Sequence, residues 1–212
     1  MSRFLNKVVR TMIISDFFLN CGWGLLGPIF AIFIVQNITV GNALEGAKVA
    51  GFASLFYWII KSAIQIPISR HLDKNHGEID DFWFMFAGTL LSGFVPLGFL
   101  ISSLPWHIYF FQIVHAIGMA MAIGSWSAIF TRHIDKGKEA FDWSVESTSV
   151  GLGAGLMGAL GGILVGFFGF QLIFIFASAF TIFSALILLL IRKDIFPEKV
   201  SPVVGPTVIT PF

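Results

Sequence analysis

The chain has 212 residues, of which 56% are hydrophobic and only 12% are charged, and its mean hydropathy is +0.87. Soluble domains carry about 25% charged residues, so this chain has too little polar surface to be a water-soluble globule. Its formal net charge of +1 and the lack of any nucleic-acid motif argue against a polyanionic partner. The composition therefore predicts an integral membrane protein.

Six segments of continuous apolar sequence are each long enough to cross a membrane as a helix, which takes roughly 20 residues. They are residues 11–38, 45–69, 81–103, 105–130, 142–168 and 170–191. Strands of a membrane barrel are excluded, because they alternate apolar and polar residues over only about 10 positions. The expected fold is an all-α integral membrane protein, with a six-helix transmembrane domain over residues 1–195 and a cytoplasmic tail over residues 196–212.

Basic residues gather at one end of these segments. They precede the first segment and follow the second, fourth and sixth: Arg3, Lys7, Arg10, Arg70, Lys74, Arg132, Lys136, Lys138, Arg192, Lys193 and Lys199. Lysine and arginine near helix ends stay in the cytoplasm, so both termini are expected to be cytoplasmic, in an inner or plasma membrane. The first segment is longer than the apolar region of a signal peptide and is expected to be retained.

One charged phrase occurs twice, each time where an apolar segment ends. SRHLDKNHGEIDDFW begins at Ser69 and TRHIDKGKEAFDW begins at Thr131, and six aligned positions read Ser/Thr-Arg-His-Leu/Ile-Asp-Lys. A basic membrane anchor accounts for the arginine and the lysine, but not for the matching histidine and aspartate. A shared function at two cytoplasmic helix exits is one interpretation, and chance or simple anchoring is the other.

Polar side chains inside apolar segments are functional hypotheses, because an ionisable group near the membrane centre costs at least about 2.5–3.5 kcal/mol. The first, second, fourth and fifth segments carry such groups, whereas residues 82–103 and 170–191 contain no ionisable side chain. Helices 1, 2, 4 and 5 are therefore expected to surround a polar cavity. The residues expected to line it are Asp16, Asn20, Trp23, Lys61, Gln65, Gln112, His115 and Glu146.

Lys61 lies about 13 Å from the inner end of its helix, at 1.5 Å per residue. This is deeper than its side chain of about 6 Å can span. It therefore needs a counter-charge, which Asp16 or Glu146 is expected to supply, in either a functional or a purely structural pair. Histidine titrates near neutral pH, so His115 is one candidate proton carrier, and the two acids are the others.

Glycines are concentrated in the first and fifth segments, in CGWGLLGP from Cys21 and GLGAGLMGALGGILVG from Gly151. Such small residues let helix backbones approach closely in a membrane. Pro28, Pro67 and Pro96 remove backbone hydrogen bonds and favour kinks. Static close packing and movement between smooth helix faces are both compatible with this pattern.

These features together resemble one six-helix half of a transporter of the major facilitator superfamily, over approximately residues 8–195. The most specific resemblance lies in the loop between helices 2 and 3, where the family has a glycine, then Asp-Arg, then a glycine and more basic residues. Here Ser69 replaces the first glycine, Asp73-Lys74 stands for Asp-Arg, and Gly77 comes one place late.

In the family, this loop latches the cytoplasmic gate, so the resemblance implies a gating role for part of the charged phrase. The second phrase resembles the family's loop between helices 4 and 5. The gate residues implied by the resemblance are Arg70, Asp73, Lys74, Arg132 and Asp135. The family's buried arginine in helix 4 is missing, and His115 or Lys61 is the implied substitute.

Full-length members of the family have two six-helix halves around a central substrate. This chain carries one, and its ending, EKVSPVVGPTVITPF, is too short and too rich in proline to form another span. We therefore expect two copies to assemble as a homodimer around a central site. One half of a heteromeric or truncated transporter is the alternative.

The expected function is alternating-access transport of a small polar solute, with sugars favoured because amides and aromatic rings suit hydroxyl-rich molecules. Proton coupling, as in a symporter, is part of this hypothesis. The alternatives are export of a drug or an organic anion, and a non-transporting membrane scaffold. An enzyme is not expected, because neither Gly-x-Ser-x-Gly nor His-Glu-x-x-His is present, and no cofactor or metal is expected.

Overall fold

The structure, a computed structural model, describes residues 5–75 and 77–196, and every regular element in these ranges is helical. The long helices are α1 (Lys7–Leu26), α3 (Ala43–Asn75), α4 (Glu78–Leu100), α5 (Pro105–His133) and α6 (Glu139–Leu188). The short ones are α2 (Phe30–Phe33), the π-helical turn η1 (Ile34–Ile38), the 3-10 turn η2 (Leu189–Ile191) and α7 (Arg192–Ile195). The tail predicted for residues 196–212 lies, apart from Phe196, outside the described residues.

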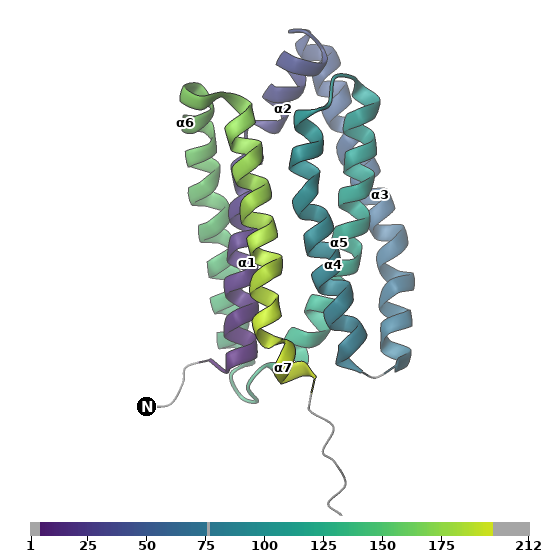
Figure 1. The fold of residues 1–212 in the computed structure, drawn as a ribbon, viewed down its shortest axis with the longest axis vertical. Coiled ribbons are helices and arrows are strands. Elements are labelled where there is room, and N and C mark those ends of the chain that lie inside the picture. The colour runs from purple at the N-terminus through teal and green to yellow at the C-terminus, as the bar shows by residue number, and fades with distance from the viewer. Residues whose placement is uncertain (1–4, 76, 197–212) are drawn as a thin grey trace, which may run out of the picture.

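The segment α6 consists of two antiparallel arms that meet at Gly169. This glycine has a φ of 73° and a ψ of 176°, a conformation that side chains with a Cβ rarely adopt. Figure 1 shows the chain reversing there, so that residues 139–168 form a first arm and residues 170–188 a second. The predicted connection between the fifth and sixth helices is therefore confirmed.

The first predicted helix is broken in the middle. The chain bends by 41° between α1 and the continuous run of α2 and η1, at Gly27 and Pro28, where proline has no amide hydrogen to donate. In contrast, α3 and α4 continue through Pro67 and Pro96. Of the three predicted proline kinks, the one at Pro28 thus breaks its helix.

Helix starts follow local sequence signals. The Asn6 side chain accepts a hydrogen bond of 2.9 Å from the Val9 amide and so caps α1. Pro105, which lacks an amide hydrogen, occupies the first turn of α5. Three acidic residues stand in the first turn of α4, where they interact favourably with the helix dipole.

Four helical stretches are long and apolar enough to cross a membrane: α3, α4, α5 and the run from α6 into α7. The bent pair of α1 with α2 and η1 brings the number to five if it is one span. Because α6 reverses at Gly169, the described chain contains six long helical arms, the number predicted. That each arm crosses a bilayer, and that both termini are cytoplasmic, remain predictions.

The arms pack side by side in one bundle (Figure 1), in which α1 lies against α6, and α5 lies against both α3 and α4. The end of the bundle where α1 begins and α3 and α5 end also carries α7 and is called here the α7 end. Helix α3 is the least covered: only 11% of its most apolar stretch is buried, against 44–50% for α4, α5 and α6. Most of the α3 surface therefore has no protein partner within the described chain.

Close approach between α1 and the first arm of α6 depends on glycines, as predicted. A Cβ on Gly24 would lie 2.7 Å from the Ala154 carbonyl oxygen, and one on Gly161 would collide with the backbone of Leu25. The same arm carries a second set of glycines around which nothing lies within 4 Å: Gly151, Gly155, Gly162 and Gly166. One glycine face of this arm is packed against α1, and the other is free.

We predict that Gly24→Ala lowers the melting temperature of the purified protein, because the added methyl group would overlap backbone atoms that cannot move independently. Overpacking of this kind costs about 1–3 kcal/mol. The matched control is Gly51→Ala in α3, where the methyl group would meet nothing within 4 Å. A Gly24→Ala protein that melts no earlier than Gly51→Ala would contradict the close packing of α1 and α6.

Candidate functional site

A cavity of about 480 Å³, called here the main cavity, lies among α1, α3, α4, α5 and both arms of α6. It is lined by Ser15, Asp16, Leu19, Asn20, Trp23, Tyr57, Thr89, His115, Met119, Ala122, Ile123, Trp126, Ser127, Glu146, Val150, Ser184 and Leu188. The four helices predicted to surround a polar interior all contribute. The third and sixth predicted helices also contribute, through Thr89 and through Ser184, so the sequence-based division of helices was too strict.

Two acidic side chains meet in this cavity. Asp16 comes from α1 and Glu146 from the first arm of α6, and their side chains lie next to each other in its lining. Two carboxylates side by side in a cavity repel each other, so the pair favours a proton or another cation in the same space. Both residues were predicted as cavity residues, but their contact was not, because no spacing rule connects residues on separate helices.

A stack of three rings separates this cavity from a second one of about 250 Å³. The His115 ring lies between Trp23, at 3.7 Å between ring centres and 8° between planes, and Tyr57, at 4.7 Å and 29°. His115 is buried, and neither of its ring nitrogens has a hydrogen-bond partner among the described residues. Trp23 and His115 were predicted; Tyr57 was not. Gln112 lines the second cavity together with these three rings.

We predict that His115→Phe keeps or raises the thermal stability, because the benzene ring preserves the stack and removes two buried nitrogens without partners. His115→Ala, in contrast, leaves a void between two rings and should cost about 2–4 kcal/mol. Thermal unfolding of the two variants measures the difference. Equal losses from both would mean that the His115 nitrogens make a stabilising interaction.

Two predicted cavity residues lie elsewhere on α3. The Lys61 ammonium stands 4.8 Å from the centre of the Trp58 ring, and Lys61 forms no ion pair within the described chain. The predicted pairing of Lys61 with Asp16 or Glu146 is thus not formed within the described chain, where the two acids lie next to each other instead. Gln65 lines a surface pocket with Arg70 and Asp73.

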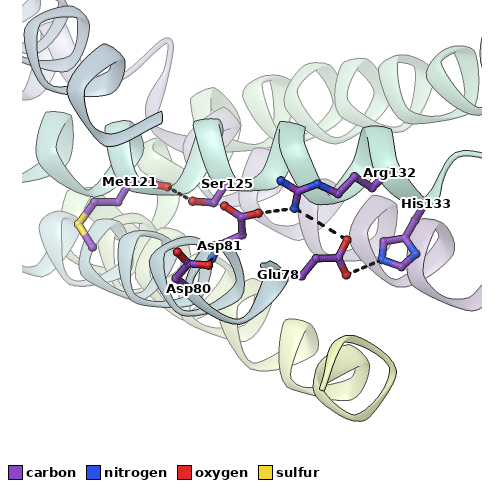
Figure 2. A network of polar contacts seen from close by, with 7 residues as sticks. All are labelled: Glu78, Asp80, Asp81, Met121, Ser125, Arg132 and His133. Carbon is purple, nitrogen blue, oxygen red and sulfur yellow. Dashed lines mark hydrogen bonds and ion pairs between the residues drawn. The ribbon is translucent and has the colours of Figure 1, made fainter. Parts of the chain in front are cut away.

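A charged network joins α5 to α4 at the α7 end (Figure 2). The Arg132 guanidinium forms an ion pair with the Asp81 carboxylate and lies 3.8 Å from Glu78. The neighbouring His133 is 3.1 Å from the other carboxylate oxygen of Glu78. Asp81 is completely buried, so its charge depends on Arg132 for compensation. Of these four residues, only Arg132 was predicted as a site residue. The acidic run GEIDD, which follows the first charged phrase, was the sequence signal from which Glu78 and Asp81 could have been found.

The second charged phrase also connects α5 to α1 and α6. The Asn6 side-chain amide donates hydrogen bonds to the His133 carbonyl and, at 3.4 Å, to the Asp135 carboxylate. The Asp135 amide donates at 3.2 Å to the Asp142 carboxylate. The equivalent residues of the first phrase, Arg70, Asp73 and Lys74, are exposed and form no ion pair within the described residues. The two phrases therefore lie in different environments, and their gating role stays a prediction.

The sequence model of the Major Facilitator Superfamily matches residues 12–211, almost the whole chain. The chain belongs to the major facilitator superfamily. Members of this superfamily are membrane transporters rather than enzymes, so the protein is a multi-pass membrane protein of the transporter class. No curated protein matches the chain. The superfamily resemblance expected from the charged phrases and the apolar segments is thus confirmed.

Proposed function

We propose that two copies of this chain form an alternating-access transporter that moves a small polar solute together with protons. The observation that carries this proposal is the contact between Asp16 and Glu146 inside the main cavity. Placing an ionisable side chain within a membrane costs free energy, so such residues usually mark a site that binds or moves a proton or a solute. A superfamily half with two acids facing a cavity is therefore suited to carry a proton and a solute in the same space.

The acid pair offers a direct route to proton coupling. When Asp16 and Glu146 share one proton, the pair carries a single negative charge, and a second proton would neutralise it. A solute in the same cavity interacts with that charge, so its affinity and the affinity of the pair for protons depend on each other. Such linkage is the requirement for coupling solute movement to a pH gradient.

A homodimer is proposed because a lone copy would expose polar groups to lipid. The α3 surface is largely uncovered and carries Lys61 and Gln65 within an apolar helix. In the superfamily, two six-helix halves enclose the substrate between them. A second copy would supply the other wall of the cavity and cover α3.

Two solute classes suit the cavity lining. Sugars are supported by Asn20 and Trp23 in the main cavity and by Gln112 in the second, because amides bind hydroxyl groups and rings stack on sugar faces. A lipophilic cation is the second candidate, since the charged groups among the lining residues are acidic and several neighbours are aromatic. An organic anion is disfavoured for the same reason, because Lys61 lies outside the lining.

The test begins with thermal stabilisation of the purified protein, screened over sugars, amino acids and cationic drugs. A saturable rise in melting temperature with one class identifies the solute class. Uptake of that compound into proteoliposomes is then measured with and without an inward proton gradient. Saturable binding with gradient-driven uptake supports the proposal. If no compound class gives a saturable response, the scaffold alternative replaces it.

A further inference from the structure

The second cavity is lined by four polar side chains that form no hydrogen bond within the described chain. Ser54 and Tyr57 stand one turn apart on α3, and Gln112 and His115 stand one turn apart on α5. Both His115 nitrogens are buried, so the other three side chains present the accessible polar groups. Polar groups inside a protein are usually paired. Two facing helices therefore present hydroxyl and amide groups to a space in which water or a ligand must bind them.

Aromatic rings form much of the remaining wall of this cavity. Trp23 comes before the break in the first predicted helix and Phe30 comes after it, so the chain bends by 41° between two lining residues. Phe99 of α4 adds a third ring, 4.9 Å from the Phe30 ring between centres. Such rings offer flat apolar faces to a ligand.

The charge and size of the cavity restrict its ligand. None of the described residues that line it is an aspartate, glutamate, lysine or arginine, so a charged ligand would lose its water without gaining a counter-charge. Its volume of about 250 Å³ is below the range of about 300–1,000 Å³ for pockets that hold drug-sized ligands. The cavity therefore suits a neutral molecule with a single ring.

The chemistry of the lining indicates a ring that carries hydroxyl groups. The Gln112 amide and the hydroxyls of Ser54 and Tyr57 can each donate and accept hydrogen bonds. A ligand hydroxyl has the same two capacities, so each such group can be matched by one of these side chains. The apolar faces of a saturated ring would pack against the aromatic wall.

This cavity is distinct from the space around the acid pair. Asp16 stands nine residues after Lys7, so it lies about 14 Å from the α7 end of its helix. Gln112 stands 21 residues before His133, so it lies about 32 Å from the same end of the bundle. The three-ring stack lies between the two cavities.

We propose that the second cavity is a solute subsite for a neutral, hydroxyl-rich ring of monosaccharide size, on the far side of the ring stack from the acid pair. The inference rests on the proposed function for transport and deepens it by naming a solute class and a second place where the solute binds. The solute is held by Gln112, Tyr57 and Ser54 on one side of the stack, and it meets the acid pair on the other.

The test measures protection of a cysteine at the rim of the cavity. Ser54→Cys in a Cys21→Ala background is labelled with N-ethylmaleimide in lipid nanodiscs, because sugar-based detergents would compete. Glucose and myo-inositol should slow the labelling in a saturable way, whereas glucosamine and glucuronate, which are charged, should protect less. The control is Ser62→Cys, about two turns further along α3 in a different pocket, and its labelling rate should not change.

Substitutions that remove one polar group then identify the contacts. Gln112→Leu and Tyr57→Phe should each raise the concentration for half protection roughly 2- to 10-fold, as expected for one lost hydrogen bond. Neither should lower the melting temperature, because neither polar group bonds within the described chain. The matched controls are Gln36→Leu, at an exposed position, and Tyr109→Phe, whose ring lies beside Phe56 outside the cavity.

The outcomes separate this inference from the proposed function. If glucose or myo-inositol protects Ser127→Cys in the main cavity but not Ser54→Cys, the second subsite is wrong and the transporter stands. The same holds if a cationic drug alone binds. If Gln112→Leu protects as well as Gln36→Leu, the ring does not bind through the amide and the subsite is wrong. If no compound class binds at all, both proposals are wrong.

Discussion

Replacing Arg132 with methionine is expected to lower the free energy of unfolding by about 3 kcal/mol, the lower end of the range for breaking a buried ion pair. The partner carboxylate of Asp81 is completely buried, so removal of the guanidinium leaves a charge without compensation at the α4–α5 contact. The lower end of the range applies because the Arg132 side chain is 35% exposed and is partly solvated already. Unfolding of the purified protein in detergent measures the loss.

The matched control is Lys7→Met. Lys7 also forms an ion pair, 2.7 Å from Asp194, but its side chain is 48% exposed. Exposed ion pairs contribute at most about 1 kcal/mol, so this variant should be close to wild type. The double variant Arg132→Met with Asp81→Asn should lose less than the sum of the single changes, because it removes the uncompensated charge. Equal losses from Arg132→Met and Lys7→Met would show that burial of Asp81 does not matter.

Glu146→Gln is expected to abolish accumulation of solute driven by a proton gradient, and Asp16→Asn should have the same effect. Either change removes one carboxyl group from the pair proposed to carry the proton, and an amide cannot take up or release a proton in its place. Exchange of labelled for unlabelled solute at equal pH should persist, because it requires binding and movement of the bundle but no net proton transfer. Both quantities are measured in proteoliposomes, with the solute identified by thermal stabilisation.

The control for these variants is Glu45→Gln. Glu45 is exposed at the start of α3, 3.2 Å from Lys48, and lies outside the cavity. Its replacement should leave both accumulation and exchange at wild-type rates. Undiminished accumulation by Glu146→Gln and Asp16→Asn would eliminate the acid pair as the proton carrier. Loss of exchange as well as accumulation would instead assign the pair to solute binding.

Much of the helical organisation could be predicted without the structure. Apolar runs of more than 20 residues indicate helices because the membrane leaves no other way to satisfy the backbone. The turn at Gly169 and the break at Gly27–Pro28 also come from local chemistry, since glycine tolerates a positive φ and proline lacks an amide hydrogen. The cavity was partly predictable as well: Asp16, Asn20, Trp23, His115 and Glu146 all line it.

Contacts between helices were less predictable. The sequence indicated that Lys61 needs an anion, and Asp16 and Glu146 were the two candidates. In the structure these acids contact each other, and Lys61 lies beside Trp58. Counting residues along the sequence does not give the rotation of each helix about its axis, and that rotation decides which side chains meet.

The sequence by itself determined the class of this protein, the number of its helical arms, and the residue types available for its cavity, because these depend on local hydrophobicity and backbone chemistry. Only the tertiary structure decided that Asp16 meets Glu146, that Arg132 compensates Asp81, and that His115 lies within a stack of rings. The physical reason is that side chains on different helices meet only after close packing, through glycines such as Gly24 and Gly161, has fixed which faces touch.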